Sequence, residues 1–485
     1  MRLRWLVLFH RWAGVTLCLL FCTWFVSGAI LHFVPFPSLT AEERLQRSQA
    51  INLDLVTLNP AAAASLVPSS SRMRLIGVVG RPVYVLDTSG DRVSAIAADT
   101  GLPLTRVSES DAAAIAGAFT GSKPSEVQGS IEFDQWVVAE EYDPYRPFLR
   151  VRLQDPAGSV VYVSERSGEV ILRTTAHERG WNWVGAVLHW IYFAPLRSHW
   201  AMWDRLVWWL ALVATCSTLV GIWLGVVRLL ANRRAHRRGL TPFRGWLGWH
   251  HRIGLVAGLA VVAWIVSGWL SMDHGRLFSR GEPTPAMASR VQGLSLASIA
   301  AAAPRQALQV AGKASEIEFA AIAGHPFIVA RANAAADSRI IWLDGSGRPS
   351  SSQIPAELLL AGVRAAWPGE VVTDGGAVTP SDLYGLAESM PVGTRVFRTE
   401  RTGVVDSYLD PVSGRLLVVM DDSRRAYAWS YYALHTLKIP GLANHPTLRR
   451  IVILALLTLG FMFSLTGAAV GISRLRATLP IPGRH

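Results

Sequence analysis

The sequence predicts a membrane protein, in which a four-helix transmembrane bundle is built from two tandem repeats that each carry an exported α+β domain. Three observations predict this fold: four long apolar runs, basic segments beside them, and a repeat of about 240 residues. Of the 485 residues, 51% are hydrophobic and only 17% are charged, whereas soluble domains carry about 25% charged residues. A soluble globular enzyme is therefore not expected.

Four runs contain no Asp, Glu, Lys or Arg, and each is long enough to cross about 30 Å of hydrocarbon. They are Trp12–Val34, Leu206–Val227, Ile253–Met272 and Ile451–Ser473. The net charge of +12 is concentrated in residues 1–11, 228–252 and 473–485, which hold Arg but no acidic residue. Basic residues stay on the cytoplasmic side, so we expect both termini and the central loop to be cytoplasmic. This placement of the charge makes a lipid bilayer the expected partner and excludes nucleic acid.

The internal repeat divides the chain into two halves of the same design. A shift of 240 residues aligns His10-x3-Gly14 with His250-x3-Gly254, and a shift of 246 aligns Arg179-x3-Trp183-x5-His189 with Arg425-x3-Trp429-x5-His435. The expected segments are a transmembrane helix (1–34), an exported domain (35–180), an interfacial segment with the second helix (181–230), a cytoplasmic loop (231–249), a third helix (250–273), a second exported domain (274–426), an interfacial segment with the fourth helix (427–473) and a cytoplasmic tail (474–485).

The exported domains have mixed α/β patterns. Ala-rich stretches predict helices over 110–120 and 356–366, and turn residues separate the β-rich runs that follow them. Strands are expected over 127–140, 148–153, 160–164 and 169–174, and over 395–399, 404–409 and 415–420. Stretches 60–70 and 281–304 are rich in Ala, Pro and Ser and are expected to be loops. The aromatic segment Trp181–Phe193 is expected to be a helix lying on the bilayer.

Histidines give the most specific functional signal. If the halves meet around an axis normal to the membrane, His10 faces His250 near the cytoplasmic side and His189 faces His435 near the outer side. Two opposed imidazoles suit the axial positions of one haem iron, and Gly14 and Gly254 would leave room for the macrocycle. Zinc would require more ligands. Hydrogen-bonded packing histidines and another metal are the alternatives.

Further residues compete for these roles. His251 is an alternative ligand to His250, while His199 and His445 are alternatives at the outer site. Arg179 and Arg425 are possible contacts for haem propionates or an anionic chelate, or else anchors at headgroup depth. Without a Cys-x-x-Cys-His motif, covalent c-type haem is excluded, so the expected cofactor is haem b, with two per chain. No catalytic residue is identified.

Several motifs together resemble a known family. They include His10-Arg-Trp-Ala-Gly14, Arg146-Pro-Phe-Leu-Arg150, Leu188-His-Trp-Ile-Tyr-Phe193 and Ser407-Tyr-Leu-Asp-Pro-Val-Ser-Gly414, and their order resembles the PepSY-associated transmembrane proteins. The resemblance implies PepSY-like exported domains, a Gram-negative inner membrane, and a relation to iron-regulated proteins that include siderophore reductases with two b-type haems. Where the family commonly has Leu-His-Ser-Leu-Asp, this chain ends the motif with Lys438.

The resulting hypothesis is an oxidoreductase of the inner membrane. It would carry electrons to a ferric siderophore in the periplasm, and loss of one unit of charge on iron would weaken its bonds to oxygen ligands. The cytoplasmic segments are too short to fold a flavin or nicotinamide domain, so the electron donor would be a quinol or a separate cytoplasmic reductase. One alternative is a membrane-anchored PepSY module that binds or inhibits envelope peptidases or other proteins. Transport of the chelate is a further alternative.

Overall fold

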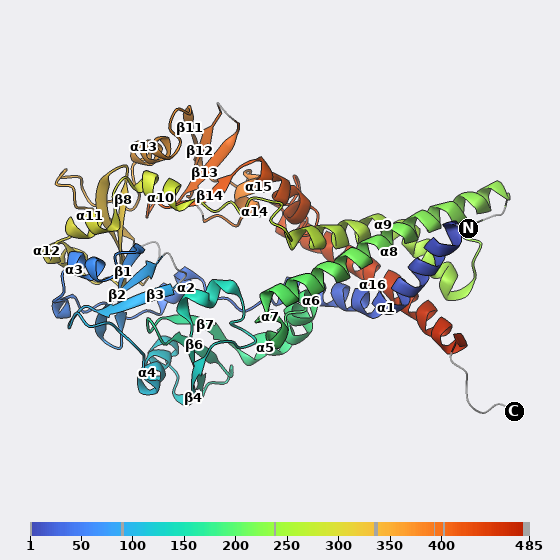
Figure 1. Cartoon of the computed structure of the whole chain (residues 1–485), viewed down its shortest axis with the longest axis horizontal. Coiled ribbons are helices and arrows are strands. Elements are labelled where there is room, and N and C mark those ends of the chain that lie inside the picture. Colours follow the sequence, from blue (N-terminus) through green and yellow to red (C-terminus); the bar gives the residue numbers. More distant parts are fainter. Residues whose placement is uncertain are drawn as a thin grey trace.

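A computed structural model of the chain describes residues 2–88, 92–236, 239–333, 338–391, 393–400 and 403–478. Four long helices form a rod, and two arms of sheets and short helices extend from one end of it (Figure 1). Residues 479–485 of the expected tail lie outside the described residues. The rod helices are α1 (Arg2–Phe33), α8 (Trp200–Arg234), α9 (Gly245–Ser271) and α16 (Pro446–Thr478).

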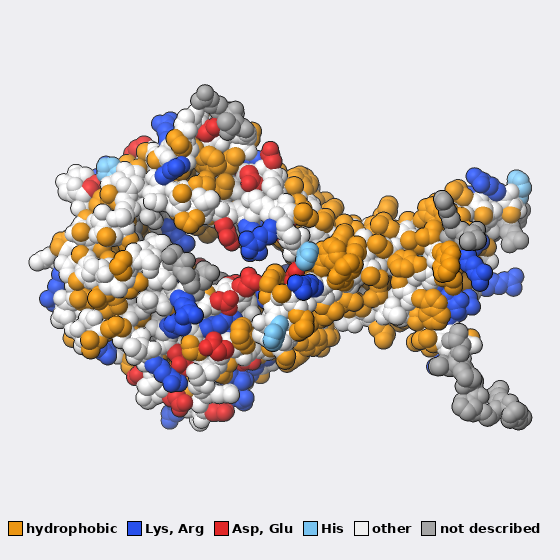
Figure 2. Space-filling model, in the orientation of Figure 1, with side chains coloured by type: hydrophobic (Ala, Val, Ile, Leu, Met, Phe, Trp, Pro, Cys, Tyr) orange, Lys and Arg blue, Asp and Glu red, His pale blue; other side chains and the backbone are white. Residues whose placement is uncertain are grey.

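The four long helices confirm the expected spans. Each includes all, or all but the last residue, of one of the charge-free runs, is long and apolar enough to cross a membrane, and extends beyond the run at one end or both. Helix α1 packs against α8 and α16, and α9 packs against the same two helices, so the four form a closed bundle. Its core includes Leu17, Phe25, Val261 and Trp264, and hydrophobic side chains also cover its visible outer face (Figure 2).

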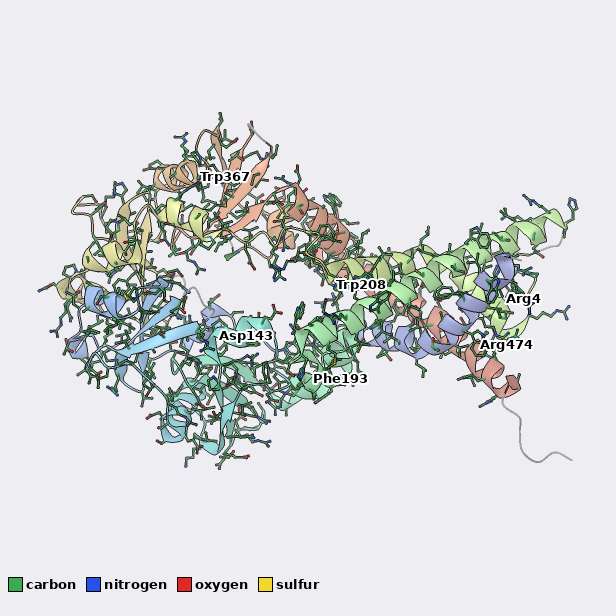
Figure 3. All side chains as sticks on the ribbon, in the orientation of Figure 1. Arg4, Asp143, Phe193, Trp208, Trp367 and Arg474 are labelled. Carbon is green, nitrogen blue, oxygen red and sulfur yellow. The ribbon has the colours of Figure 1, made fainter. Side chains whose placement is uncertain are left out.

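The two ends of the bundle differ in charge and in what they carry. One end bears the arms and is called here the sheet-side end. The opposite, loop-side end carries the connection between α8 and α9, and Arg4 and Arg474 lie close to it (Figure 3). The described parts of the three basic segments (2–11, 228–252 and 473–478) therefore lie at the end of the bundle that is farthest from the sheets.

A six-stranded sheet joins the two arms. Its order is β10-β9-β8-β1-β2-β3, and antiparallel pairing of β1 with β8 places Met73 opposite Phe319. Residues from both expected exported domains thus share one sheet, an arrangement that the sequence patterns did not predict. Its strands are β1 (Ser70–Val78), β2 (Arg81–Thr88), β3 (Arg92–Ala97), β8 (Glu316–Ile322), β9 (His325–Arg331) and β10 (Arg339–Trp342).

Each arm also holds a four-stranded antiparallel sheet whose strands follow chain order. Helix α4 (Glu109–Thr120) packs on one sheet and α13 (Ala356–Ala366) on the other, as the buried apolar clusters show. Most of the expected strands are present. The sheets consist of β4 (Pro124–Ile131), β5 (Phe148–Leu153), β6 (Val160–Ser164) and β7 (Val170–Thr174), and of β11 (Val372–Ala377), β12 (Arg395–Thr399), β13 (Val405–Leu409) and β14 (Leu416–Met420).

Two local expectations are wrong. The strand expected over 127–140 ends at Ile131, because the buried Arg146 side chain donates to the carbonyls of Glu132, Val137 and Ala139 and curls the chain around itself. The stretches 60–70 and 281–304, which were expected to be loops, contain short helices instead. Pro and Ser also suit helix N-termini, and they stand there in these helices. Those helices are α3 (Pro60–Leu66), α10 (Pro285–Gln292) and α11 (Leu296–Ala301).

The segments that lead from the sheets to the bundle are helices that contain a π-helical turn. In the first half, α5 (Ala176–Asn182) continues into a π-helical turn (Trp183–Val187) and α6 (Leu188–Trp190), and the helix ends where Ile191 adopts a left-handed φ of 54°. In the second half, α15 (Asp422–Tyr427) continues into a π-helical turn (Ala428–Ala433). Single π turns frequently mark functional sites. The helix expected over 181–193 is therefore present as far as Trp190 and ends three residues earlier than expected.

The remaining short elements lie in the arms or, in the case of α7, directly before α8. They are α2 (Ala41–Gln46), η1 (Leu53–Leu55), η2 (Glu140–Tyr145), α7 (Ala194–Arg197), α12 (Arg305–Gln309) and α14 (Leu383–Ala387).

A buried ion network ties the shared sheet to the first arm. Arg74 is 2% exposed, and its guanidinium lies 2.7 Å from a carboxylate oxygen of Glu169 and 3.2 Å from one of Glu316. Burial opposes ionisation of Glu316, but the charges of Arg74, Arg44 and Arg331 lower its pKa to about 2. Removing one partner from such a network leaves an uncompensated buried charge, which typically costs about 3–5 kcal/mol.

Candidate haem-binding site: two histidine pairs

The structure brings together the histidines that the repeat aligns. At the loop-side end, the rings of His10 on α1 and His250 on α9 have centroids 6.5 Å apart and planes inclined by 32°. At the sheet-side end, the rings of His189 on α6 and His435 after the second π turn have centroids 6.3 Å apart and planes inclined by 68°. The two pairs therefore have nearly the same separation although different elements supply them.

The sheet-side pair is held by matching contacts in the two halves. His189 Nδ1 lies 3.0 Å from Ser27 Oγ, and His435 Nδ1 lies 3.1 Å from Ser267 Oγ. Each serine hydroxyl donates its own proton to a backbone carbonyl three residues earlier, so it accepts from Nδ1–H. Each imidazole is thereby fixed as the tautomer whose Nε2 carries a free lone pair.

The loop-side pair is held in the same way. His10 Nδ1 lies 2.9 Å from the carbonyl oxygen of Ser217, which can only accept. His250 Nδ1 lies 3.2 Å from Thr466 Oγ1, whose proton is donated to the carbonyl of Phe463. All four rings thus hold their proton on Nδ1 and leave Nε2 as the electron-pair donor. Hydrogen bonds of this kind are the usual outer-shell support of metal-bound histidine.

Each of the four imidazoles lies against a glycine of a neighbouring helix. A Cβ added at Gly221 would lie 2.4 Å from His10 Cε1, and one added at Gly467 would lie 3.3 Å from His250 Cε1. At Gly28 and Gly268 the corresponding distances to His189 and His435 are 3.3 and 3.2 Å. The repeat shifts already align these glycines in pairs, which is the signal that could have identified them from the sequence.

Gly14 and Gly254, which the sequence analysis expected to leave room for a macrocycle, differ in their surroundings. A Cβ at Gly14 would meet no atom within 4 Å, so space is open one turn from His10. At Gly254 a Cβ would lie 2.9 Å from the Phe463 ring, which stacks on His250 with centroids 4.6 Å apart. Room beside the loop-side pair is therefore found on the α1 side, and an aromatic ring closes the α9 side.

The separation of the ring centres matches that of two axial ligands of one metal. Metal–nitrogen bonds of about 2.0 Å, with about 1.1 Å from nitrogen to ring centre, place two opposed imidazole centroids roughly 6.2 Å apart. In the described part of the chain, no group of three or more His, Cys, Asp or Glu side chains could hold a metal ion. A metal held between one of these pairs would need its remaining ligands from elsewhere, and a porphyrin supplies four.

The alternative histidines lie away from this arrangement. His251 is buried, its Nε2 bonds the Gly225 carbonyl at 2.9 Å, and its Nδ1 has no hydrogen-bond partner among the described residues; the ring that faces His10 is that of His250. His199 is the exposed residue before α8, and its Nδ1 lies 3.0 Å from the Pro195 carbonyl oxygen. His445 is exposed directly before α16. Among the described residues, neither His251 nor His199 stacks on or faces another histidine ring as the paired rings do.

The two aligned arginines bond within the arms. Arg179 donates to Thr174 and, at 2.8 Å, to the Gly158 carbonyl, while burial lowers the pKa of Arg179. Arg425 lies 2.9 Å from the Asp406 carboxylate of β13. Each arginine therefore holds the start of its helix, α5 or α15, against the adjacent sheet. A contact with haem propionates or a chelate stays a prediction.

Four membrane-spanning helices with attached sheets define a multi-pass membrane protein. The chain belongs to the family described as PepSY-associated TM region, which matches residues 7–474, and the resemblance stated from the sequence motifs is thereby confirmed. Comparisons with curated proteins and with solved structures gave no match.

Proposed function

We propose that this chain is a b-type di-haem electron-transfer protein of the bacterial inner membrane, which reduces ferric siderophore in the periplasm to release iron. We further propose that its halves are tandem repeats with PepSY-like domains on the periplasmic side. The observation that carries the proposal is the pair of histidine sites, each with centroids 6.3–6.5 Å apart and each supported from both halves. In this assignment the sheet-side end is periplasmic and the loop-side end is cytoplasmic.

The residues of the chain fit the cofactor in three respects. Four Nε2 lone pairs are available as axial ligands, in two sets of two. Ser27, Ser267, Thr466 and the Ser217 carbonyl hold the rings in the required tautomer. Glycines allow the rings to approach the helices closely. When bound, haem supplies a one-electron couple between Fe(III) and Fe(II), and neutral imidazoles are its usual axial ligands.

The spacing of the two sites suits transfer across the membrane. His10 and the Ser27 that holds His189 lie on the same helix, about 17 residues apart, which corresponds to about 25 Å along the axis. His250 and Ser267 repeat this spacing on α9. Since the hydrocarbon core is about 30 Å thick, one site lies near each face of the bilayer.

The space between the arms is the proposed substrate site. Figure 2 shows an opening between the arms and the sheet-side end of the bundle, with acidic and basic side chains around it. Asp143 belongs to one arm, Trp367 to the other, and Trp208 lies where the bundle begins (Figure 3). A chelate held here would lie above the sheet-side pair. The electron donor is a quinol or a separate cytoplasmic reductase.

The proposal is tested by combining spectroscopy with iron release. Purified protein reduced with dithionite should show the split visible bands of six-coordinate b-type haem. Addition of a ferric hydroxamate siderophore, with a ferrous chelator as trap, should reoxidise the haem and form the ferrous complex. His435→Ala should abolish iron release, because Ala offers no ligand at the sheet-side site, and His445→Ala is the matched control. Colourless protein, or equal release by both variants, would refute the proposal.

A further inference from the structure

An apolar groove of about 510 Å³ runs between α1 and α16 in the sheet-side half of the bundle. Aromatic side chains contribute much of its wall: Phe25 and Phe33 from α1, Phe461 from α16, and Trp181 from α5. Phe33 is 60% exposed and Trp181 is 49% exposed, so the groove opens towards lipid. Its volume is within the range of sites for small organic ligands, about 300–1,000 Å³.

The equivalent position in the other half is filled. The repeat shifts align Ala29 with Trp269 and Leu454 with Trp208. These two tryptophans pack against each other between α8 and α9, with ring centroids 5.4 Å apart. The bundle geometry therefore does not by itself require a groove. It is open between α1 and α16 because smaller side chains occupy both positions there.

Two hydrogen-bond donors lie beside residues that line one end of the groove, called here its mouth. Arg450 lies one turn before Leu454 on α16, and its guanidinium is 6.0 Å from the Phe33 ring centroid. Its Nε donates to His32 Nε2 at 3.3 Å, which leaves Nδ1–H of a neutral His32 as a second donor. The aligned position in the other half holds Asp204, paired with His274 at 2.6 Å. The two mouths thus differ in charge as well as in space.

The groove is separated from the sheet-side histidine pair by little more than one layer of side chains. Leu457 lines the groove, and a Cβ at Gly28 would contact both Leu457 (3.5 Å) and His189 (3.3 Å). Ile30 also lines the groove and packs against Gly185 of the π turn that precedes His189. A ligand in the groove would therefore be a close neighbour of His189.

We propose that this groove binds an isoprenoid quinol, and that the quinol donates electrons to the sheet-side site. The apolar tail would lie in the groove between α1 and α16, and the flat ring would pack against its aromatic walls. Arg450 and His32 would donate hydrogen bonds to the ring oxygens. The donor role rests on the proposed function. A quinol gives up two electrons and two protons when it becomes a quinone; two one-electron ferric acceptors take the electrons, and water at the mouth takes the protons.

Binding is tested with an azido derivative of decylubiquinone as a photo-cross-linker on the full chain in nanodiscs. Label should map to the α1 and α16 segments that line the groove. The double variant Ala29→Trp/Leu454→Trp, which copies the filled half, should reduce this label at least tenfold. Leu259→Trp is the matched control, since Leu259 is 76% exposed on α9, and it should label like the parent. Equal label in both variants, or displacement by phosphatidylglycerol but not by decylubiquinone, would overturn the inference.

A second measurement separates this inference from the proposed function. With haem bound, decylubiquinol should reduce the groove variant at least tenfold more slowly than the parent, while dithionite should reduce both equally. If dithionite-reduced protein releases iron but decylubiquinol reduces both proteins at the same rate, the groove is not the donor site and the proposed function stands. If label maps to the groove but the protein is colourless, the proposed function fails and quinone binding stands.

Discussion

Replacing Gly221 by Ala tests whether the glycine that contacts His10 is needed to hold this imidazole in place. The added Cβ would lie 2.4 Å from His10 Cε1 and 2.9 Å from its Nδ1, whereas ordinary contacts begin at 3.4 Å. The ring must therefore move by about 1 Å. Metal–ligand distances tolerate only about 0.2 Å, and the same movement would disturb the hydrogen bond to Ser217. We expect the variant to lose the loop-side haem and keep the other.

The assay is a pyridine haemochromogen count, normalised to protein that elutes as a single species. Gly225→Ala is the control on the same helix one turn away, because its Cβ would make ordinary contacts of 3.6–3.9 Å. Ala is also the better helix former by about 1 kcal/mol, so helix destabilisation would not explain a loss at Gly221. Two haems in Gly221→Ala with an unchanged spectrum would show that His10 is not held as described.

Three further predictions follow from other parts of the molecule. His251→Ala should keep both haems by the same count, because the ring that faces His10 is that of His250; loss of one haem would make His251 a ligand. The pKa of Glu316 is lowered from 4.5 to about 2, so the stability that its ion pairs contribute is present above pH 4.5 and is lost as the pH falls towards 2. Limited proteolysis with an acid-active protease should therefore cut the arms faster as the pH falls through this range. An unchanged rate of cleavage between pH 4.5 and 2 would show that the network does not stabilise the arms. An alkaline phosphatase fusion after Arg484 should be inactive and a green fluorescent protein fusion there fluorescent; the reverse pattern would invert the assigned topology.

The membrane part could be predicted from sequence because its determinants are local. A charge-free run of sufficient length forms a helix in a bilayer whatever surrounds it. Pairing of His10 with His250, and of His189 with His435, was predicted from the two sequence shifts, and the structure places each pair of rings together. Strands such as Phe148–Leu153 and Val160–Ser164 were likewise predictable from β-rich runs between turns.

The features that were missed depend on long-range contacts. Pairing of β1 with β8 joins residues that are about 240 positions apart, and no local pattern specifies it. The strand expected to continue past Ile131 is ended by Arg146, which follows it in sequence and is positioned by tertiary structure. The glycines beneath the imidazoles could be aligned from sequence, but only the packing of neighbouring helices shows that a histidine lies on each.

The haem content of the purified protein tests the central claim most directly. A pyridine haemochromogen assay on the parent chain and on His10→Ala, His250→Ala, His189→Ala and His435→Ala should give about two haems for the parent and about one for each variant. The spectrum that remains should be the same within a pair and different between pairs. A parent chain without haem, or single variants that all retain two, would contradict the assignment of these four histidines as axial ligands.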